Sequence, residues 1–214
     1  MIFKICGLKE KDSILCCEAN NVDFFGLIFY EKSPRNISYK DARDLIYFAK
    51  DLRIIPVGVF VNKEISDLKD IITYLNLKYI QLHGDESQEY IDEIKNTLGI
   101  KIIKKFSIES EKDLIKIDQI NNIDYLLFDY KPSSNELPGG NSKSFDWNLL
   151  NNVQIKRPWF VSGGINESNI KNIKKTLNPN GIDLSSGVEE SLGIKSNKKI
   201  NNLFRLFYDN KKFF

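Results

Sequence analysis

The sequence is poor in the residues that build metal sites and disulfide frameworks. Its 214 residues include one histidine, one methionine and three cysteines. The cysteine count is odd, Cys16 and Cys17 are adjacent, and no Cys-x-x-Cys pair occurs. We therefore expect no disulfide framework and no metal site, and the free thiols favour a cytoplasmic location. Cys16 and Cys17 fall in a helical stretch, and we expect neither to be functional.

Long apolar runs and an excess of one charge are also missing. No apolar stretch approaches the roughly 20 residues that span a bilayer. The N-terminal residues 1–7 lack the long apolar stretch of a signal peptide. The 31 basic and 29 acidic side chains leave a formal charge of +2. This balance argues against a dedicated nucleic-acid binder and against a protein held on membranes by a basic surface.

The remaining pattern is typical of one globular domain over residues 1–214, with 42% apolar and 28% charged residues. Short β-rich runs alternate with stretches of helical period. Strands are expected at residues 3–7, 24–30, 55–61, 79–84, 101–107, 125–130, 159–163 and 181–185. Helices are expected at residues 38–52, 64–76, 87–98, 110–120, 168–177 and 196–210, with a short one near 146–151.

Eight strands that alternate with helices predict an α/β protein, either a (β/α)8 TIM barrel or a doubly wound sheet. At 214 residues, a barrel would lie near the lower size limit of about 200 residues, so its loops must be short. Residues 131–144 form the one long irregular stretch, which contains Gly139 and Gly140. Because the active-site loops of a barrel follow its strands, we expect this loop to act as a lid.

Polar side chains interrupt several strands, always toward the C-terminal end and on one face. Successive side chains of a strand point to opposite faces, and a strand buried on both faces should be almost continuously apolar. Any one of these polar side chains, taken alone, could instead lie in solvent at a frayed strand end. In a barrel the shared face is the interior and that end is the catalytic mouth. We expect the following side chains to converge there: Lys4, Cys6, Gln81, His83, Asp129 and Asp183.

Two glycine-containing loops follow the last two strands. Ser162-Gly163-Gly164 follows the seventh strand, and Ser185-Ser186-Gly187 follows the eighth. Glycine lets the backbone approach an anion closely, and free backbone N–H groups attract negative charge. Barrels frequently bind phosphate at these two loops. We therefore expect phosphate binding by Gly163, Gly164, Ser185, Ser186 and Gly187.

Seven of the eight strand ends carry motifs that belong together. They are Lys4-Ile5-Cys6-Gly7, Gly26-Leu27-Ile28-Phe29 with Ser33-Pro34-Arg35-Asn36-Ile37-Ser38, Val57-Gly58-Val59-Phe60-Val61-Asn62, Gln81-Leu82-His83-Gly84, Gly139-Gly140 with Phe145-Asp146-Trp147, and the two glycine loops with Asp183 and Val188-Glu189. In this order and spacing they closely resemble the phosphoribosylanthranilate isomerase family. The resemblance implies a (β/α)8 barrel and an Amadori rearrangement of a small phosphosugar in tryptophan biosynthesis, without a cofactor.

The resemblance also implies two catalytic residues, a general base at Cys6 and a general acid at Asp129. Opening the ribose ring requires a proton, and the iminium that forms must then lose its C2′ proton. A thiol is a poor base at neutral pH unless its thiolate is favoured, and Lys4 on the same strand face offers a positive charge. Asp129 needs an apolar or anionic neighbourhood to hold a proton.

The remaining expected site residues bind the substrate. The resemblance implies that Arg35 holds the anthranilate carboxylate, which a guanidinium can bind through two hydrogen bonds. We interpret Gln81 and His83 as residues that orient the substrate, and we assign neither a catalytic proton. Asp183 is expected to hydrogen-bond the hydroxyls of the opened sugar. The sequence leaves open whether the protein is a monomer or a homodimer.

Two positions depart from the pattern of the family. Ser142 stands where the loop after the sixth strand usually has a glycine, and a positive φ there would strain a serine by about 1 kcal/mol or somewhat more. Ser196 replaces an acidic residue, but a serine can still cap the last helix. The first change bears on the lid, and the second is not expected to affect the chemistry.

Three other functions fit the sequence less well than this family does. The histidine-pathway isomerase has aspartates at the ends of strands 1 and 5, whereas these strands end here in Cys6 and near Phe106-Ser107. Indole-glycerol-phosphate synthase needs a pair of catalytic lysines and a longer chain. A catalytically silent relative that only binds a phosphorylated sugar would not need both Cys6 and Asp129.

Overall fold

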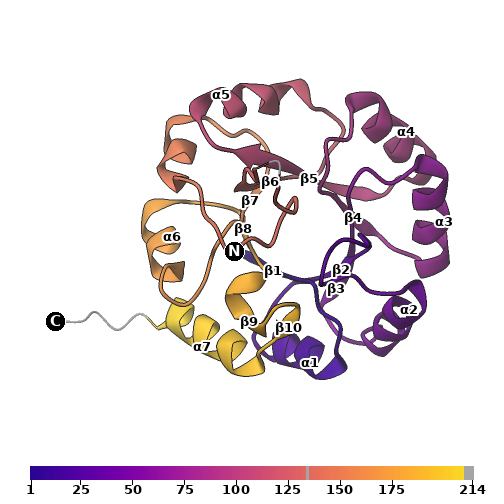
Figure 1. The fold of residues 1–214 in the computed structure, drawn as a ribbon, viewed down its shortest axis with the longest axis horizontal. Coiled ribbons are helices and arrows are strands. Elements are labelled where there is room, and N and C mark those ends of the chain that lie inside the picture. Colours follow the sequence, from indigo (N-terminus) through magenta and orange to yellow (C-terminus); the bar gives the residue numbers. More distant parts are fainter. Residues whose placement is uncertain (134, 210–214) are drawn as a thin grey trace.

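The computed structural model describes residues 1–133 and 135–209, and its centre is a closed barrel of eight parallel strands (Figure 1). The strands are β1 (Ile2–Cys6), β2 (Phe24–Ile28), β3 (Ile55–Phe60), β4 (Tyr79–Leu82), β5 (Lys101–Ile108), β6 (Tyr125–Tyr130), β7 (Trp159–Val161) and β8 (Gly181–Leu184). Because β1 pairs with β2 on one side and with β8 on the other, the sheet has no edge. The predicted (β/α)8 barrel is confirmed, and the doubly wound sheet is excluded.

Helices surround the barrel. They are α1 (Lys11–Ala19), α2 (Tyr39–Phe48), α3 (Ile65–Leu75), α4 (Gln88–Leu98), α5 (Glu111–Leu114), α6 (Ile170–Thr176) and α7 (Asn197–Tyr208), with the 3-10 helices η1 (Ile115–Gln119), η2 (Trp147–Asn152) and η3 (Ser186–Val188). Ser38, Ser87 and Ser196 each accept a hydrogen bond from the backbone N–H three residues later, so they cap α2, α4 and α7. The predicted last residue of the final helix, Asn210, lies outside the described residues.

The structure differs from the expected elements in three places. The helix expected at residues 110–120 consists of the short α5 followed by η1. The helix expected at residues 168–177 begins at Ile170, because Asn166 Oδ1 accepts hydrogen bonds from the N and Oγ atoms of Ser168 and fixes a turn first. A two-stranded antiparallel sheet of β9 (Glu189–Ser191) and β10 (Ile194–Lys195) was not expected, because it is too short to show a period.

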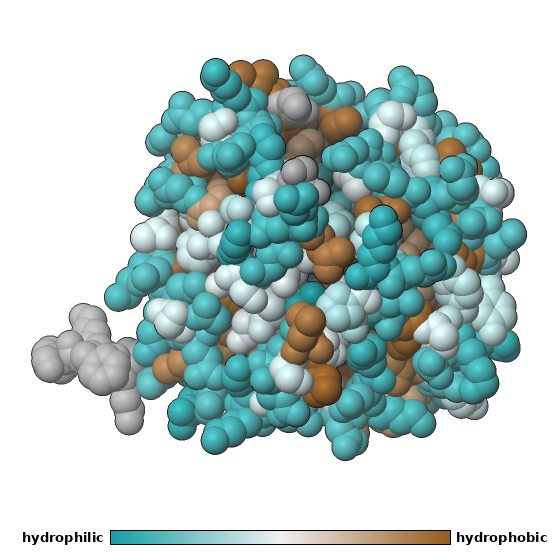
Figure 2. All heavy atoms as spheres, viewed as in Figure 1, coloured by the Kyte–Doolittle hydropathy of each residue, from teal (hydrophilic) through white to brown (hydrophobic). Residues whose placement is uncertain are grey.

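Apolar side chains pack in two separate layers. Inside the barrel, one cluster fills the centre with Phe24, Val57, Ile103, Leu127 and Phe160. A larger cluster lies between the strands and the surrounding helices. Polar side chains dominate the outer face in Figure 2, and apolar residues are scattered among them. Among the described residues, no helix is both long enough and apolar enough to cross a membrane.

A buried ion pair between Lys104 of β5 and Glu86, on the outer side of the barrel sheet, fixes the loops after β3 and β4. Lys104 Nζ donates to Glu86 Oε2 at 2.5 Å and to the carbonyl oxygen of Gly84 at 2.8 Å. Glu86 Oε1 accepts hydrogen bonds from the backbone N–H groups of Asn62 and Gly84, at 3.0 and 3.1 Å. Since β4 ends just before His83, this pair holds the strand end that carries the histidine.

Candidate active site

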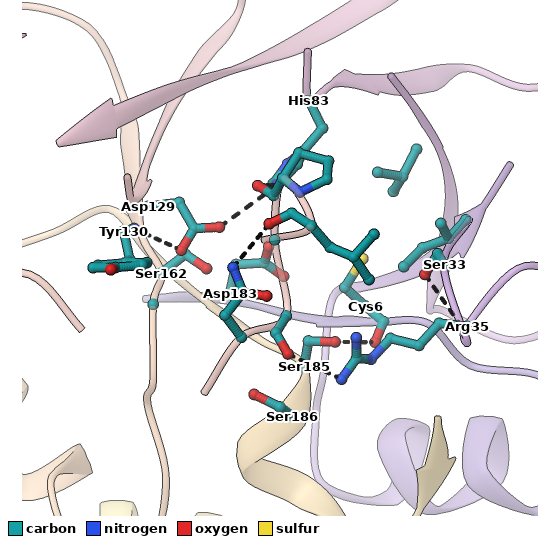
Figure 3. Close-up of a pocket in the computed structure, with 18 of the residues that line it drawn as sticks. Cys6, Ser33, Arg35, His83, Asp129, Tyr130, Ser162, Asp183, Ser185 and Ser186 are labelled. Carbon is teal, nitrogen blue, oxygen red and sulfur yellow. Dashed lines mark hydrogen bonds and ion pairs between the residues drawn. The ribbon is translucent and has the colours of Figure 1, made fainter. Parts of the chain in front are cut away.

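A cavity of about 820 Å³, including its open mouth, lies at the carboxyl ends of the barrel strands. Side chains from several strands and loops converge on it (Figure 3). Most of the residues singled out in the sequence line it, namely Cys6, Arg35, Gln81, His83, Asp129, Gly139, Gly140, Gly163, Gly164, Asp183, Ser185 and Ser186. Lys4 and Gly187 contact lining residues instead.

Cys6 is the last residue of β1, and its thiol is buried on the same strand face as Lys4. A Cβ at Gly26 would lie 2.7 Å from Cys6 Sγ, so this glycine makes room for the thiol. Lys4 Nζ lies 3.0 Å from Asp183 Oδ1, and both side chains are buried. Burial raises the pKa of Cys6, whereas the charges of Lys4 and Lys195 lower it. Lys4 acts in the expected direction, but burial outweighs it, so the resting form is the thiol.

Asp129 lies near the end of β6 and faces His83 (Figure 3). Its Oδ2 atom is 3.6 Å from His83 Nε2, and its Oδ1 accepts a hydrogen bond of 2.8 Å from the backbone N–H of Tyr130. Burial raises the pKa of Asp129 to about 7, aided by the charge of Asp183 and opposed by the Tyr130 hydrogen bond and by nearby lysines. A carboxyl group that titrates near neutral pH can give and take a proton during catalysis.

His83 is neutral and holds a defined orientation. Burial and the charges of Lys105 and Lys4 lower its pKa well below 6.5. Its Nδ1 atom lies 2.8 Å from Gln81 Nε2, and its Nε2 atom lies 3.1 Å from the carbonyl oxygen of Pro138. Both contacts fit the tautomer with its proton on Nε2. Gln81 Oε1 is buried and has no hydrogen-bond partner in the described part of the chain, which leaves an acceptor in the cavity wall.

Arg35 lies in the loop after β2 and is buried rather than solvated. Its Nε and Nη2 atoms donate to the two carboxylate oxygens of Glu189, at 2.6 and 2.8 Å. Nη2 also donates to the carbonyl oxygen of Gly140 at 3.3 Å. The side chain reaches toward Ser185 and Cys6 (Figure 3), so a fixed guanidinium stands at one end of the cavity.

The two glycine loops meet at another side of the cavity. Gly163 and Gly164 have φ angles of 89° and 63°, in the left-handed region that favours glycine. A Cβ at Gly187 would overlap the carbonyl oxygen of Ile165, so only glycine lets the two loops approach this closely. Ser185 Oγ donates to the carbonyl oxygen of Cys6 at 3.1 Å, which ties the second loop to the end of β1.

The described part of the loop over residues 131–144 covers the cavity. The carbonyl oxygen of Pro138 contacts His83, and the carbonyl oxygen of Gly140 accepts a hydrogen bond from Arg35. A Cβ at Gly139 would lie 2.5 Å from His83 Nε2, so the backbone lies directly against the imidazole. Ser142 has a φ of 58°. The serine therefore occupies the left-handed region, where strain of about 1 kcal/mol was expected.

Sequence reasoning assigned no role to three charged residues beside the cavity, namely Lys105, Glu189 and Lys195. Lys105 faces the barrel interior, and its Nζ atom donates to Ser107 Oγ at 2.7 Å. The alternation of side chains along β5 could have revealed Lys105 and Ser107, since both share a strand face with the interior residue Ile103. Glu189 and Lys195 are buried partners, with Nζ 2.7 Å from Oε1. Glu189 belongs to a motif that carries the resemblance, but no local pattern indicates its partner, because Arg35 is 154 residues away in the chain.

The arrangement suits acid–base chemistry on a small anionic molecule. A thiol and a carboxyl group that titrates near neutral pH line one cavity, with an arginine and two glycine loops around them. In residues 1–133 and 135–209, no group of three or more His, Cys, Asp or Glu side chains could hold a metal ion. The chemistry that these residues offer is proton transfer.

Comparisons with known sequences point to one family. The model of the N-(5'-phosphoribosyl)anthranilate (PRA) isomerase family matches residues 3–205. A protein from Rhizobium etli named N-(5'-phosphoribosyl)anthranilate isomerase is 39% identical over 203 residues, which are 94% of this chain and 91% of that protein. A protein of the same name from Paramagnetospirillum magneticum is 35% identical over 199 residues, 92% of each chain.

Solved structures agree with the sequences. The phosphoribosyl anthranilate isomerase of Thermotoga maritima superposes with a TM-score of 0.86 at 30% identity, covering 97% of this chain and 98% of that one. A structure of such an isomerase in complex with reduced 1-(o-carboxyphenylamino)-1-deoxyribulose 5-phosphate gives a TM-score of 0.82 at 30% identity, covering 97% and 98% of the two chains. The resemblance seen in the sequence motifs is confirmed, and the chain belongs to the N-(5'-phosphoribosyl)anthranilate isomerase family.

Proposed function

We propose that the cavity isomerises N-(5'-phosphoribosyl)anthranilate to 1-(2-carboxyphenylamino)-1-deoxyribulose 5-phosphate, the aldose-to-ketose step of tryptophan biosynthesis. Asp129 is the general acid and Cys6 the general base. The observation that carries this proposal is that one cavity contains both the Cys6 thiol and a carboxyl group whose pKa is raised to about 7. No cofactor is needed, because every step moves only protons and electron pairs within the substrate.

The reaction proceeds in three stages, which together move four protons. Asp129 donates a proton to the ribose ring oxygen while the anilino nitrogen forms a double bond to C1′ and the ring C–O bond breaks. The thiolate of Cys6 then takes the proton from C2′, and the electron pair moves to neutralise the iminium, giving an enolamine. Finally C1′ gains a proton and the C2′ hydroxyl loses one, which leaves the ketone.

The acid and the base together hold one proton in the active form. At a pH between the pKa of Asp129 and the raised pKa of Cys6, the pair carries a single proton, which rests mainly on the thiol. The productive form has this proton on Asp129 and a thiolate at Cys6. The iminium that forms beside Cys6 is positively charged, so it favours the thiolate when that thiolate is needed.

Substrate binding uses the remaining lining residues. Arg35 binds the anthranilate carboxylate, and its fixed, buried guanidinium supports that role. Asp183, held by Lys4, accepts hydrogen bonds from the sugar hydroxyls. Gln81 and His83 orient the substrate, and the unpaired Gln81 Oε1 supports this assignment. The phosphate is bound by the two glycine loops, with Gly163, Gly164, Ser185, Ser186 and Gly187. Gly139 and Gly140 cover the cavity as part of a lid.

The protein's surroundings are proposed from the same family relationship. A small phosphosugar is the partner, and neither nucleic acid nor a membrane is needed for the reaction. A solved structure from Thermotoga maritima, 31% identical with a TM-score of 0.82, is of monomers generated from a dimeric isomerase. We propose a cytoplasmic monomer or homodimer, which analytical ultracentrifugation distinguishes directly.

Turnover of freshly generated phosphoribosylanthranilate tests the function. Addition of the purified protein should accelerate the loss of the substrate's fluorescence. The Cys6→Ser variant should lower kcat by about 100-fold or more, the usual contribution of a positioned base. Cys16→Ser, at a half-buried position of α1 that does not line the cavity, is the matched control and should leave kcat unchanged. Phosphate binding without turnover would instead identify a silent relative, and full activity of Cys6→Ser would refute the base assignment.

A further inference from the structure

The small sheet of β9 and β10, outside the barrel, packs against the loop that carries Arg35. Gly193 lies in the turn between β9 and β10 and has a φ of 81°. A Cβ at this position would lie 2.8 Å from the carbonyl oxygen of Pro34. The backbone N–H of Gly193 also donates to Glu189 Oε2 at 3.2 Å. The turn therefore fixes the carboxylate of Glu189 and presses it against the loop after β2, directly behind Arg35.

Glu189 occupies one edge of the Arg35 guanidinium and leaves another edge for the cavity. A guanidinium has five N–H donors in a plane. Glu189 binds the edge formed by Nε and Nη2 with two short hydrogen bonds. The end formed by Nη1 and Nη2 faces the loop over residues 131–144, where Nη2 donates to the carbonyl oxygen of Gly140 at 3.3 Å. An incoming carboxylate can bind this end through two hydrogen bonds and replace Gly140.

Lys195 connects the same carboxylate to the second glycine loop. Its Nζ atom lies 2.7 Å from Glu189 Oε1. The ammonium also donates to the carbonyl oxygen of Ser185 at 3.0 Å and to its Oγ at 3.3 Å. One buried carboxylate thus joins Arg35 to the Ser185 loop through Lys195.

The cluster keeps a positive charge despite its central carboxylate. Burial favours the protonated form of Glu189, but hydrogen bonds from Arg35 and the charge of Lys195 lower its pKa to about 2. Glu189 is therefore ionised at neutral pH. Burial lowers the pKa of Lys195, and the charge of Glu189 opposes that shift. With Lys195 protonated, two cations and one anion leave one net positive charge, so Glu189 orders both cations without abolishing their attraction for an anionic substrate.

We propose that Glu189 is a positioning residue, which aims Arg35 at the substrate carboxylate and, through Lys195, holds the Ser185 loop at the phosphate. The β9–β10 sheet thereby fixes the separation of the two anion sites, and it selects substrates that carry a carboxylate and a phosphate at that separation. This inference rests on the proposed function, since it assumes that Arg35 meets the carboxylate of the substrate.

Two ligands that differ in one carboxylate test the proposal. Both contain a 1-amino-1-deoxyribitol 5-phosphate chain, and the amine carries either a 2-carboxyphenyl or a phenyl group. The ratio of their dissociation constants, measured by calorimetry, reports the contribution of the carboxylate. In Glu189→Gln this ratio should fall by roughly 10- to 100-fold, the effect of one or two charge-assisted hydrogen bonds. An unchanged ratio would overturn the positioning of Arg35.

The control variants separate positioning from general damage. Glu190→Gln alters the next residue of the same strand, which is exposed, and should leave both affinities unchanged. Glu189→Asp keeps the charge and should retain part of the wild-type ratio, and it carries the test if Glu189→Gln does not fold. A uniform weakening of both ligands in both variants would indicate only structural damage and would overturn the proposal.

Lys195→Met tests the second half of the proposal. Both ligands carry the phosphate, so both should bind more weakly by a similar factor, while the ratio stays near that of the wild type. Unchanged affinity for both ligands would refute the connection to the Ser185 loop. A wild-type protein that binds the two ligands equally would instead contradict the assignment of Arg35 in the proposed function, so the two failures are distinguishable.

Discussion

His83 Nε2 lies 3.6 Å from Asp129 Oδ2, and this histidine is neutral while the carboxyl group titrates near neutral pH. A neutral imidazole with its proton on Nε2 can face the carboxyl group in either protonation state without adding a charge. The histidine therefore lies beside the acid and does not compete for its proton. The pH dependence of turnover should follow Asp129 and Cys6.

The first prediction concerns the pH profile of kcat/KM. Below a pH of about 7 both Asp129 and Cys6 hold protons, so the base is missing. Above the pKa of Cys6, which burial raises from its ordinary 9.0, neither group holds a proton and the acid is missing. The profile should therefore be bell-shaped, with its acid limb near pH 7 and its alkaline limb above pH 9. Steady-state rates between pH 5 and 10.5 check this, and maximal activity at about pH 5 would contradict it.

The second prediction concerns Lys105, whose positive charge lowers the pKa of Asp129. Removal of this charge in Lys105→Met should raise the pKa of Asp129, so the acid limb should move to higher pH while the alkaline limb stays in place. Lys156→Met removes an exposed lysine that precedes β7, at the opposite end of the barrel, and serves as the control. An acid limb that stays in place, or moves to lower pH, in Lys105→Met would refute the assignment of this limb to Asp129.

The third prediction concerns Ser142 in the loop over the cavity. Its φ of 58° strains a serine, so Ser142→Gly should relieve up to about 1 kcal/mol and raise the melting temperature slightly. Ser144, also exposed, has no positive φ, so Ser144→Gly should lower stability by roughly 0.5 kcal/mol, because glycine gives the unfolded chain more freedom. Calorimetry compares the two variants, and shifts of the same sign would contradict the argument.

The fourth prediction concerns the buried pair of Lys104 and Glu86. Lys104→Met leaves the Glu86 carboxylate buried with its cationic partner gone, which should cost about 3 kcal/mol of unfolding free energy or more. The exposed Lys112→Met should change stability by less than about 0.5 kcal/mol. Urea unfolding curves measure both variants. A loss for Lys104→Met no larger than that of the control would show that the pair does not support the loops.

The alternation of side chains along the strands predicted much of the site. The parity of Lys4 with Cys6, and of Gln81 with His83, indicated one common face, and the closed barrel brings these side chains to one cavity or directly beneath it. The expected helices that begin at residues 38, 87 and 196 each have that serine as their N-cap in the structure, and an N-cap is a local interaction within four residues. These features depend only on neighbouring residues and on the geometry of a strand or a helix.

Other features depend on contacts between distant segments and could not be predicted locally. The parity of Cys6 with Lys4 suggested a favoured thiolate, but complete burial of the thiol reverses the net shift of its pKa. Arg35 was expected to hold the carboxylate of the substrate, and no neighbouring residue indicated that Glu189 occupies one edge of its guanidinium. Burial and long-range pairing are properties of the assembled barrel, so a single sequence does not display them.

The ion pair of Lys4 with Asp183 joins the first strand of the barrel to the last, 179 residues apart in the chain. Cys6 follows on one side of this junction, and the Ser185 loop follows on the other. The centre of the site is therefore absent until β8 closes against β1. Turnover consequently reports completion of the barrel, and a folding intermediate that lacks the β1–β8 pairing should bind no substrate even when its other strands are formed.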